Sequence, residues 1–442
     1  MWVERLLVSL AKNVFVSHPL VVMLAAAAVL AGCRDKPRFD ASVKAASSSS
    51  AQPLPVAPSP AAAKEALADP ARGKELVLSF QCNRCHDGTG HPPAPDGKHC
   101  VHCHTNIMDD KFAAPRASLV RWKPRVKELA DAPSLEAIGK RFTRTWVTSY
   151  LLQPSHLRPH LHAYMPRLPL TPAEARDVAA YLVPESEPPS PSAVSPEFAG
   201  ADLGKGRQLL ETKGCGSCHV FTGVVALPSS APPPMDGKEF ERGYKLAPDL
   251  RFARERMTIA NLMAWLENPK AVKSDTPMPA IALTKAEVRD LAAYILTVEL
   301  GSPPGKPAFA RLPVLERKVT FAEVDQKVFH RTCWHCHSEP DYAIGDGGPG
   351  NSGGFGFKPR GLNLSDYSGI AAGYVDDKGE RASIFAKDNE GVPRLVRALL
   401  ARHEEENSGA TGPVRGMPLG YAPLSAEDIQ LVESWVAQGR PR

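Results

Sequence analysis

The chain has 442 residues, 43% of them hydrophobic, and a formal charge of +5. At about 150 residues per domain this length predicts about three domains, and the hydrophobic content is enough for several modest cores. The charge is too small to indicate a nucleic-acid partner.

The first 33 residues have the pattern of an export signal. Arg5 and Lys12 precede an apolar stretch over 20–31, and a Leu-Ala-Gly-Cys sequence then ends at Cys33. That tetrapeptide resembles a bacterial lipobox, so we expect a lipoprotein signal peptide over 1–33 that is cleaved before Cys33, with lipid on this cysteine. An uncleaved membrane anchor is the alternative, although the apolar stretch is short for a span, which needs about 20 residues.

Four Cys-x-x-Cys-His strings account for eight of the nine cysteines. Two thiols three positions apart can both reach the vinyl groups on one edge of a porphyrin, and the following imidazole can then bind the iron. The strings therefore predict four covalently attached haem c groups. The attaching residues are Cys82, Cys85, Cys100, Cys103, Cys215, Cys218, Cys333 and Cys336, and the axial histidines are His86, His104, His219 and His337.

Proline-rich segments divide the rest of the chain. Residues 34–68 are predicted to be a disordered tether, and 186–200 and 301–318 to be linkers. The three remaining units, 69–185, 201–300 and 319–442, repeat one order of elements. In each, a short helical pattern precedes the haem motif, a Met-Pro pair follows it, and a helix with an N-terminal cap signal ends the unit. The methionines are Met165, Met278 and Met417, and the caps are Thr171, Thr284 and Ser425.

This order of elements resembles the class I cytochrome c domain. The resemblance covers nearly all of residues 70–442 and implies a mainly α fold, with tandem cytochrome c-like helical domains joined by proline-rich linkers. It also implies that Met165, Met278 and Met417 supply sixth iron ligands and that the two terminal helices of a unit cross. The third unit has a glycine-rich loop over 345–356 and a long interval before Met417, so we expect a variant domain there.

The first unit has two haem motifs but one Met-Pro pair, so we expect a dihaem domain. We assign Met165 to the Cys82 haem because the opening helix leads into that motif, and the reverse assignment to the Cys100 haem stays open. The Cys100 haem then needs a sixth ligand from elsewhere. The candidates are His91, His156, His160 and His162.

Two other interpretations of the cysteines are weaker. The four cysteines from Cys82 to Cys103 have spacing close to that of a zinc ribbon, and cysteines of exported proteins commonly form disulfides. Neither interpretation explains why a histidine follows every pair. Covalent haem attachment explains all four strings together.

The predicted function is electron transfer. Iron held by histidine and methionine exchanges electrons with both axial positions filled. We therefore expect a tetrahaem cytochrome c that relays electrons between redox protein partners, alone or as the cytochrome subunit of an oxidoreductase. Its lipid would anchor it to a membrane of the cell envelope, facing the periplasm. The alternative is a haem enzyme, a peroxidase or a small-molecule reductase, which needs an open iron position and would use the Cys100 haem.

Overall fold

The computed structural model describes residues 67–162, 165–184, 195–228, 234–303, 305, 307–339, 348–408 and 412–442. These residues are mainly helical, with one two-stranded antiparallel sheet, which confirms the mainly α fold class. The predicted signal peptide, Cys33 and nearly all of the predicted tether lie outside them. Within the described ranges, no helix is both long enough and apolar enough to cross a bilayer.

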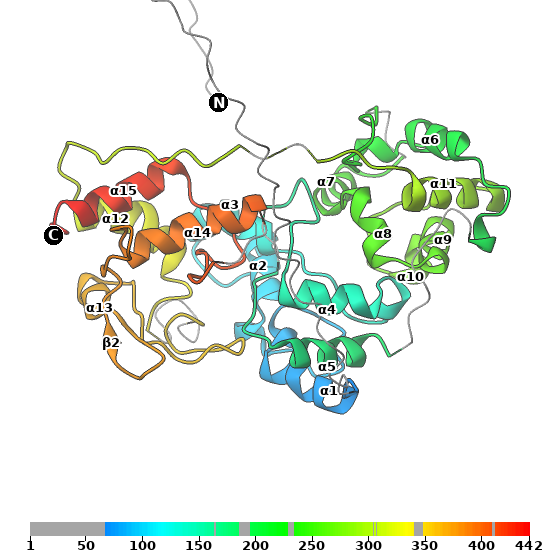
Figure 1. The fold of residues 1–442 in the computed structure, drawn as a ribbon. Helices are drawn as coiled ribbons and strands as arrows, with labels where there is room; N and C mark the ends of the chain where they lie inside the picture. Colours follow the sequence, from blue (N-terminus) through cyan, green and yellow to red (C-terminus); the bar gives the residue numbers. More distant parts are fainter. Residues whose placement is uncertain are drawn as a thin grey trace, which may run out of the picture. The chain divides into compact units, whose positions relative to one another are not determined.

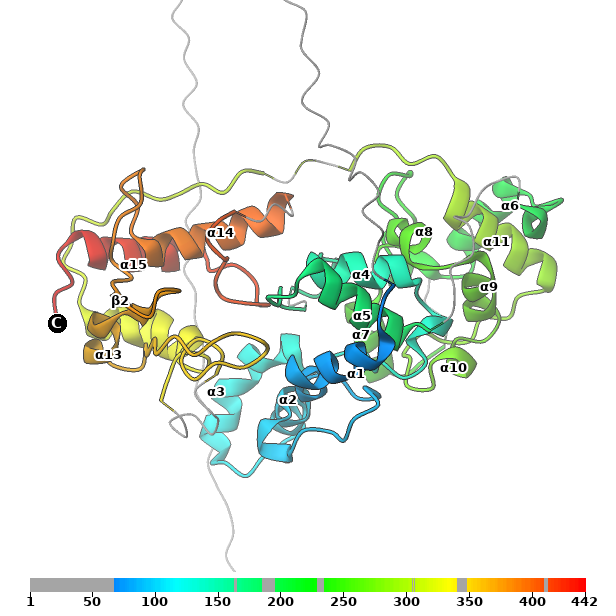
Figure 2. The same cartoon turned by 60° about the horizontal axis from the view of Figure 1, so that its bottom comes forward.

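In the first unit, the first and last helices cross at a glycine. A Cβ atom on Gly73 of α1 would lie 2.0 Å from the carbonyl oxygen of Asp177 in α5, so only glycine permits this approach. The Asp177 carboxylate accepts the Asp69 backbone N–H (2.8 Å) and pairs with Arg72 (2.7 Å), which holds the start of α1. The helices, shown in Figures 1 and 2, are α1 (Pro70–Ser79), α2 (Cys100–Met108), α3 (Arg116–Val126), α4 (Arg144–Leu152) and α5 (Pro172–Leu182).

The second unit repeats this crossing with α6 and α11. A Cβ atom on Gly206 would lie 2.3 Å from the Asp290 carbonyl oxygen, and the Asp290 carboxylate accepts the Asp202 backbone N–H (3.0 Å). The two units therefore share the terminal-helix crossing that the resemblance to class I cytochrome c implied. The helices are α6 (Leu203–Thr212), α7 (Gly237–Leu246), α8 (Ala253–Arg256), α9 (Ile259–Glu267), α10 (Pro269–Val272) and α11 (Lys285–Thr297).

The third unit is organised differently around its haem motif. Its opening helix α12 continues as a π-helix, η8, which ends at the first cysteine of the motif. Trp435 of α15 is fully buried, with the rings of Phe321 and Phe329 packed against it. The elements are α12 (Phe321–Val324), η8 (Asp325–Cys333), α13 (Tyr367–Ala372), β1 (Tyr374–Val375), β2 (Arg381–Ala382), α14 (Arg394–Ser408) and α15 (Ala426–Ala437). The predicted glycine-rich loop is described from residue 348 onward.

The predicted caps of the closing helices form as expected. Thr171 and Thr284 each make a complete capping box with the glutamate three residues later. The Ser425 hydroxyl accepts the Asp428 backbone N–H at 3.1 Å. These contacts satisfy backbone donors that the first turn of a helix leaves without partners.

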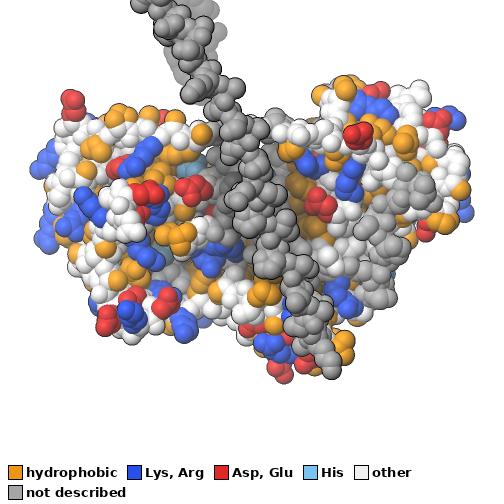
Figure 3. All heavy atoms as spheres, in the orientation of Figure 1, with side chains coloured by type: hydrophobic (Ala, Val, Ile, Leu, Met, Phe, Trp, Pro, Cys, Tyr) orange, Lys and Arg blue, Asp and Glu red, His pale blue; other side chains and the backbone are white. Residues whose placement is uncertain are grey.

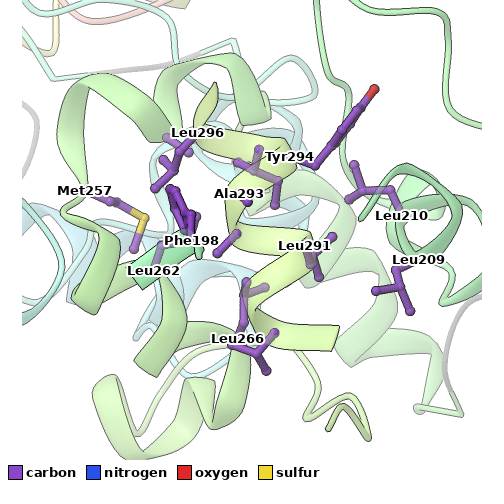
Figure 4. Packing of buried hydrophobic residues seen from close by; sticks show 14 of the residues in the cluster. Phe198, Leu209, Leu210, Met257, Leu262, Leu266, Leu291, Ala293, Tyr294 and Leu296 are labelled. Carbon is purple, nitrogen blue, oxygen red and sulfur yellow. The ribbon is translucent and has the colours of Figure 1, made fainter. Parts of the chain in front are cut away.

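Two segments expected to be linkers take part in the cores. Phe198, from the predicted linker 186–200, lies in the second core beside α9 and α11 (Figure 4). In the predicted linker 301–318, the backbone N–H of Leu315 donates to the Ser434 hydroxyl of α15 (2.9 Å). Phe198 and Leu315 of the expected linkers therefore pack against the second and third cores, because these apolar side chains have a core to enter.

The surface carries charges of both signs. On the face drawn in Figure 3, lysine and arginine side chains alternate with aspartate and glutamate over the described residues. Such a mixed surface fits the small net charge of the chain.

Candidate haem sites

Two motif histidines, His86 in the first unit and His219 in the second, are held in the same way. Each motif forms a 3₁₀ turn in which the histidine N–H donates to the carbonyl of the first cysteine (2.9 Å). Ring atom Nδ1 lies 2.8 Å from a proline carbonyl, Pro133 for His86 and Pro248 for His219. Because a carbonyl only accepts, Nδ1 carries the proton and Nε2 keeps the lone pair that a metal needs.

Burial keeps both rings neutral. It lowers the pKa of His86 and of His219, because removing an imidazolium from water is unfavourable. A neutral imidazole is the form that binds a metal ion. Both rings are therefore oriented and in the protonation state required of an axial ligand.

His104 is buried and His337 is half-buried, and their surroundings differ from those of His86 and His219. His104 Nδ1 lies 3.3 Å from the Leu129 carbonyl, and burial lowers its pKa to about 4. Burial also lowers the pKa of His337 to about 4, and a hydrogen bond with the Leu362 backbone opposes this shift in part. The backbone of Gly350 lies against the His337 ring, where a Cβ atom would come within 2.0 Å. All four motif histidines are therefore neutral and enclosed.

The described cysteines form neither a disulfide nor a cluster of the kind that binds zinc. None of the eight described cysteines forms a disulfide. Burial raises the pKa of Cys82 and Cys215 to about 11 and that of Cys333 to about 12, so these thiols are protonated at neutral pH. A zinc site needs thiolates gathered around one point. In the described ranges, one group of at least three metal-ligating side chains has its ligand atoms within 4.8 Å of one another. That group contains no cysteine.

That group, Asp87, His99 and His102, has a structural role. His99 caps the N-terminus of α2, because its Nδ1 accepts the His102 backbone N–H (3.1 Å). The His99 proton is then on Nε2, which lies 3.5 Å from the Asp87 carboxylate. The His99 and His102 rings stack with their centroids 3.5 Å apart. A ring nitrogen that carries a proton cannot ligate a metal, so these residues fix the helix that carries the Cys100 motif.

One cavity of about 400 Å³ joins the first two units. It is lined by Cys82, His86 and Met165 from the first unit and by Cys215, Cys218, His219 and Met278 from the second. Cys100 also reaches this cavity, whereas Cys103 and His104 do not line it. Met165 therefore lines the same cavity as Cys82 and Cys100, the two sites between which its assignment was left open, and the Cys82 and Cys215 motifs open into the same space.

The other two predicted methionines have distinct contacts. The Met278 sulfur accepts a hydrogen bond from the Trp265 indole Nε1 (2.8 Å). Met417 packs partly buried against the third core, together with Cys333, and its backbone N–H donates to the Ala398 carbonyl (2.8 Å). Met278 thus lies in the cavity of its own motif, and Met417 lies at the core that also contacts its motif.

The four histidine candidates for the Cys100 site have other neighbours. His91 Nε2 lies 2.7 Å from the Lys74 carbonyl, and the His160 ring stacks on Tyr244 with centroids 3.8 Å apart. His156 lines the shared cavity, and the His162 N–H donates to Glu128. The ring that lies beside His104 is that of His335, within the fourth motif.

Three arginines, Arg141, Arg158 and Arg256, line the shared cavity. The carboxylates of Asp275, Asp131 and Asp249 act on them electrostatically, but none is within ion-pair distance among the described residues. Arg141 and Arg256 are 4% and 9% exposed, and their guanidinium groups flank the ring of Phe142 at 5.3 and 5.5 Å. Burial, with repulsion from the other two arginines, lowers the pKa of Arg256 to about 10. Burial also lowers the pKa of Arg141 and Arg158. None of the three forms an ion pair with a carboxylate among the described residues.

This arginine cluster fits a haem with its propionates. Buried cations are unfavourable unless an anion and hydrogen bonds compensate for the lost water, and the buried Nε atoms of Arg141 and Arg256 have no hydrogen-bond partner in the described ranges. Arginine binds carboxylates with paired, charge-assisted hydrogen bonds. Thiols, neutral imidazoles, methionine sulfur and buried guanidinium groups therefore line one apolar cavity, and these are side chains that fit covalently attached haem.

The third unit lies against the first near the Cys100 motif. The Phe355 N–H donates to the Gln81 side chain (3.2 Å), and the Arg84 guanidinium lies 5.0 Å from the Phe355 ring centre. The Cys85 and Cys100 thiols are hydrogen-bonded to each other. Together with Cys336, they raise the pKa of the buried Tyr421 hydroxyl, although burial is the larger cause. Thiols of three motifs therefore interact electrostatically with one tyrosine.

A family model for cytochrome c matches residues 203–299, which is the second unit. No curated protein and no solved structure matches the chain. The chain thus contains a cytochrome c domain, the kind of domain that binds haem c covalently and transfers electrons through it. The matched residues include Cys215, Cys218, His219 and Met278.

Sequence reasoning missed the arginine cluster, Tyr421 and His335. The arginines come from separate segments and form no motif, so no local signal could have identified them. His335 occupies a variable position of the fourth motif, and histidine there was the available signal.

Proposed function

We propose that this chain is a tetrahaem cytochrome c that relays electrons between redox protein partners. The proposal depends on one observation: each of the four motif sites adjoins the next, in the spatial order Cys215, Cys82, Cys100, Cys333. One cavity contains the first two motifs, the Cys85 and Cys100 thiols are hydrogen-bonded, and the His104 ring has the His335 ring beside it. This order differs from the order of the motifs in the sequence.

The chemistry of the sites supports the same function. Haem c supplies reversible one-electron chemistry at its iron. The protein contributes neutral imidazoles fixed by backbone carbonyls, methionine sulfur at the shared cavity, and the arginine cluster as a source of positive charge. Low solvent access around such groups strengthens their electrostatic effect on the potential of each site.

Site removal tests the proposed order. Intact-mass analysis of the mature protein should show four haem additions, and three would refute the assignment of one motif. Cys100→Ala with Cys103→Ala should remove one haem and slow electron passage between the Cys215 and Cys333 ends, measured after rapid photoreduction. Cys215→Ala with Cys218→Ala should also remove one haem, but exchange among the other three should persist because this site is terminal. Equal effects of the two double variants would refute the order.

We also propose that the protein is anchored by lipid on Cys33, facing the periplasm. The support is the Leu-Ala-Gly-Cys sequence after an apolar stretch, together with haem motifs that are matured outside the cytoplasm. Cys33→Ser should leave an uncleaved precursor without lipid, detected by mass spectrometry of the membrane fraction. Maturation of the variant to the same N-terminus would contradict the proposal.

A further inference from the structure

The ring of His335 lies beside that of His104, at a distance that suits a single iron between them. The two ring centroids are 6.4 Å apart, and the ring planes are inclined by 43°. A metal–imidazole bond is about 2.0 Å long, and the ring centre lies about 1 Å beyond the nitrogen, so two imidazoles on opposite sides of one metal have centroids roughly 6 Å apart. The spacing is too large for direct stacking and matches two axial ligands.

His104 is oriented to bind on that side. Its Nδ1 is engaged by the Leu129 carbonyl, so Nε2 is the nitrogen left for a metal. The ring is 6% exposed, and α2, which carries it, is fixed by the His99 cap. The imidazole on the other side of the iron would then have to come from another segment of the chain.

His335 is brought there by the third unit. It lies two residues before His337, the axial histidine of its own motif, so one short segment presents rings toward two sites. The Arg125 guanidinium of α3 donates to the Arg331 carbonyl (3.2 Å), which attaches the segment before His335 to the first unit. The contact of Phe355 with Gln81 holds the same two units together.

We propose that His335 is the sixth iron ligand at the Cys100 site, opposite His104. The proposal rests on the proposed tetrahaem function, because it requires haem at Cys100 and Cys103. It gives this site two imidazole ligands and a lower potential than a site with methionine, since imidazole donates more strongly than a thioether. It also fills the coordination position that a haem enzyme would need open.

The proposal makes the first and third units share one metal centre. The haem would be attached to the chain at Cys100 and Cys103, and its iron would be bound by His335. Together these bonds would close a long loop of the chain. Such a cross-link reduces the conformational freedom of the unfolded chain. Docking of the third unit should therefore depend on occupancy of the Cys100 site.

Replacing the ligand tests the proposal in the mature protein. In oxidised His335→Gly, one haem in four should change from low spin to high spin by electron paramagnetic resonance, and added imidazole should restore it. After reduction, one equivalent of carbon monoxide should bind per chain, whereas the parent should bind little. His330→Gln is the matched control, because His330 stacks on Trp334 in the same segment but faces no motif histidine of another site.

His335→Met is the second variant, because it keeps a ligating side chain within the fourth motif. All haems of this variant should stay low spin, while the low reduction potential of one haem should rise. An unchanged spin state and no carbon monoxide binding in His335→Gly, or an unchanged set of potentials in His335→Met, would overturn the proposal. The same changes in a glutamine variant of His91, His156, His160 or His162 would also overturn it.

Mass analysis separates this proposal from the tetrahaem function. Haem on the peptide with Cys100 and Cys103 but no spectral response to loss of His335 refutes the ligand alone. Absence of haem from that peptide in the parent protein refutes the tetrahaem function and the ligand with it.

Discussion

Replacing Arg256 with methionine should destabilise the haem-loaded protein by about 3 kcal/mol. The side chain is 9% exposed and lies near two other arginines, so a haem propionate would be its compensating anion, and the magnitude is that of breaking a buried ion pair. Burial lowers the pKa of Arg256 from 12.5 to about 10, which corresponds to about 3 kcal/mol of unfavourable free energy for its charged form. This penalty is present at every pH below 10 and disappears only as the pH rises toward 12.5.

The direction of the change distinguishes two states of the cavity. If haem propionates lie against the arginine cluster, methionine leaves a buried carboxylate without its partner, and breaking such a pair costs about 3–5 kcal/mol. If no anion is there, methionine removes an uncompensated charge from an apolar site and should stabilise the protein. The two cases therefore predict opposite signs.

The measurement is equilibrium unfolding of mature protein in urea at pH 7, followed by far-ultraviolet circular dichroism. Arg121→Met is the matched control, because Arg121 is exposed on α3 and does not line the cavity; it should change the free energy of unfolding by less than about 0.5 kcal/mol. Equal or greater stability of Arg256→Met would refute the assignment of the cluster to propionates.

Two further predictions concern stability. Gly206→Ala should lower the free energy of unfolding by about 1–3 kcal/mol, because the new Cβ would lie 2.3 Å from the Asp290 carbonyl oxygen. Gly204→Ala, in the exposed first turn of α6, should be neutral or slightly stabilising. Similar losses of stability in both variants, measured by thermal unfolding, would contradict this account. Arg317 and Lys327 lower the pKa of Glu323 to about 2, so its ion pairs stabilise the fold above pH 4.5 and are lost as the pH falls toward 2. Glu323→Gln should therefore cost up to about 1 kcal/mol at pH 7 and nothing near pH 2, and a pH-independent difference would refute this account.

Local rules predicted the elements of each unit correctly. The capping boxes at Thr171 and Thr284 form because a hydroxyl and a carboxylate three residues apart satisfy each other's backbone donors. The haem motifs are local in the same sense, since cysteines three positions apart are close in the 3₁₀ turns of Cys82 and Cys215 and in the helix that begins at Cys100. The family match over residues 203–299 covers the unit that follows the pattern most simply.

Segment boundaries were less predictable. Phe198 and Leu315 lie in proline-rich stretches that read as linkers, yet both have partners in a core or on α15. Composition describes a segment alone, whereas burial depends on whether a neighbouring surface has room for it.

By itself, the sequence determined the helical class, the four motifs and their histidines, because each depends on residues a few positions apart. Only the tertiary structure decided that the Cys82 and Cys215 motifs share one cavity, that three arginines meet there, and that His335 lies beside His104. These relations join residues from separate segments of the chain, and they depend on how whole units pack. No local propensity or spacing encodes such packing, which is set by the sum of many weak contacts across the interfaces.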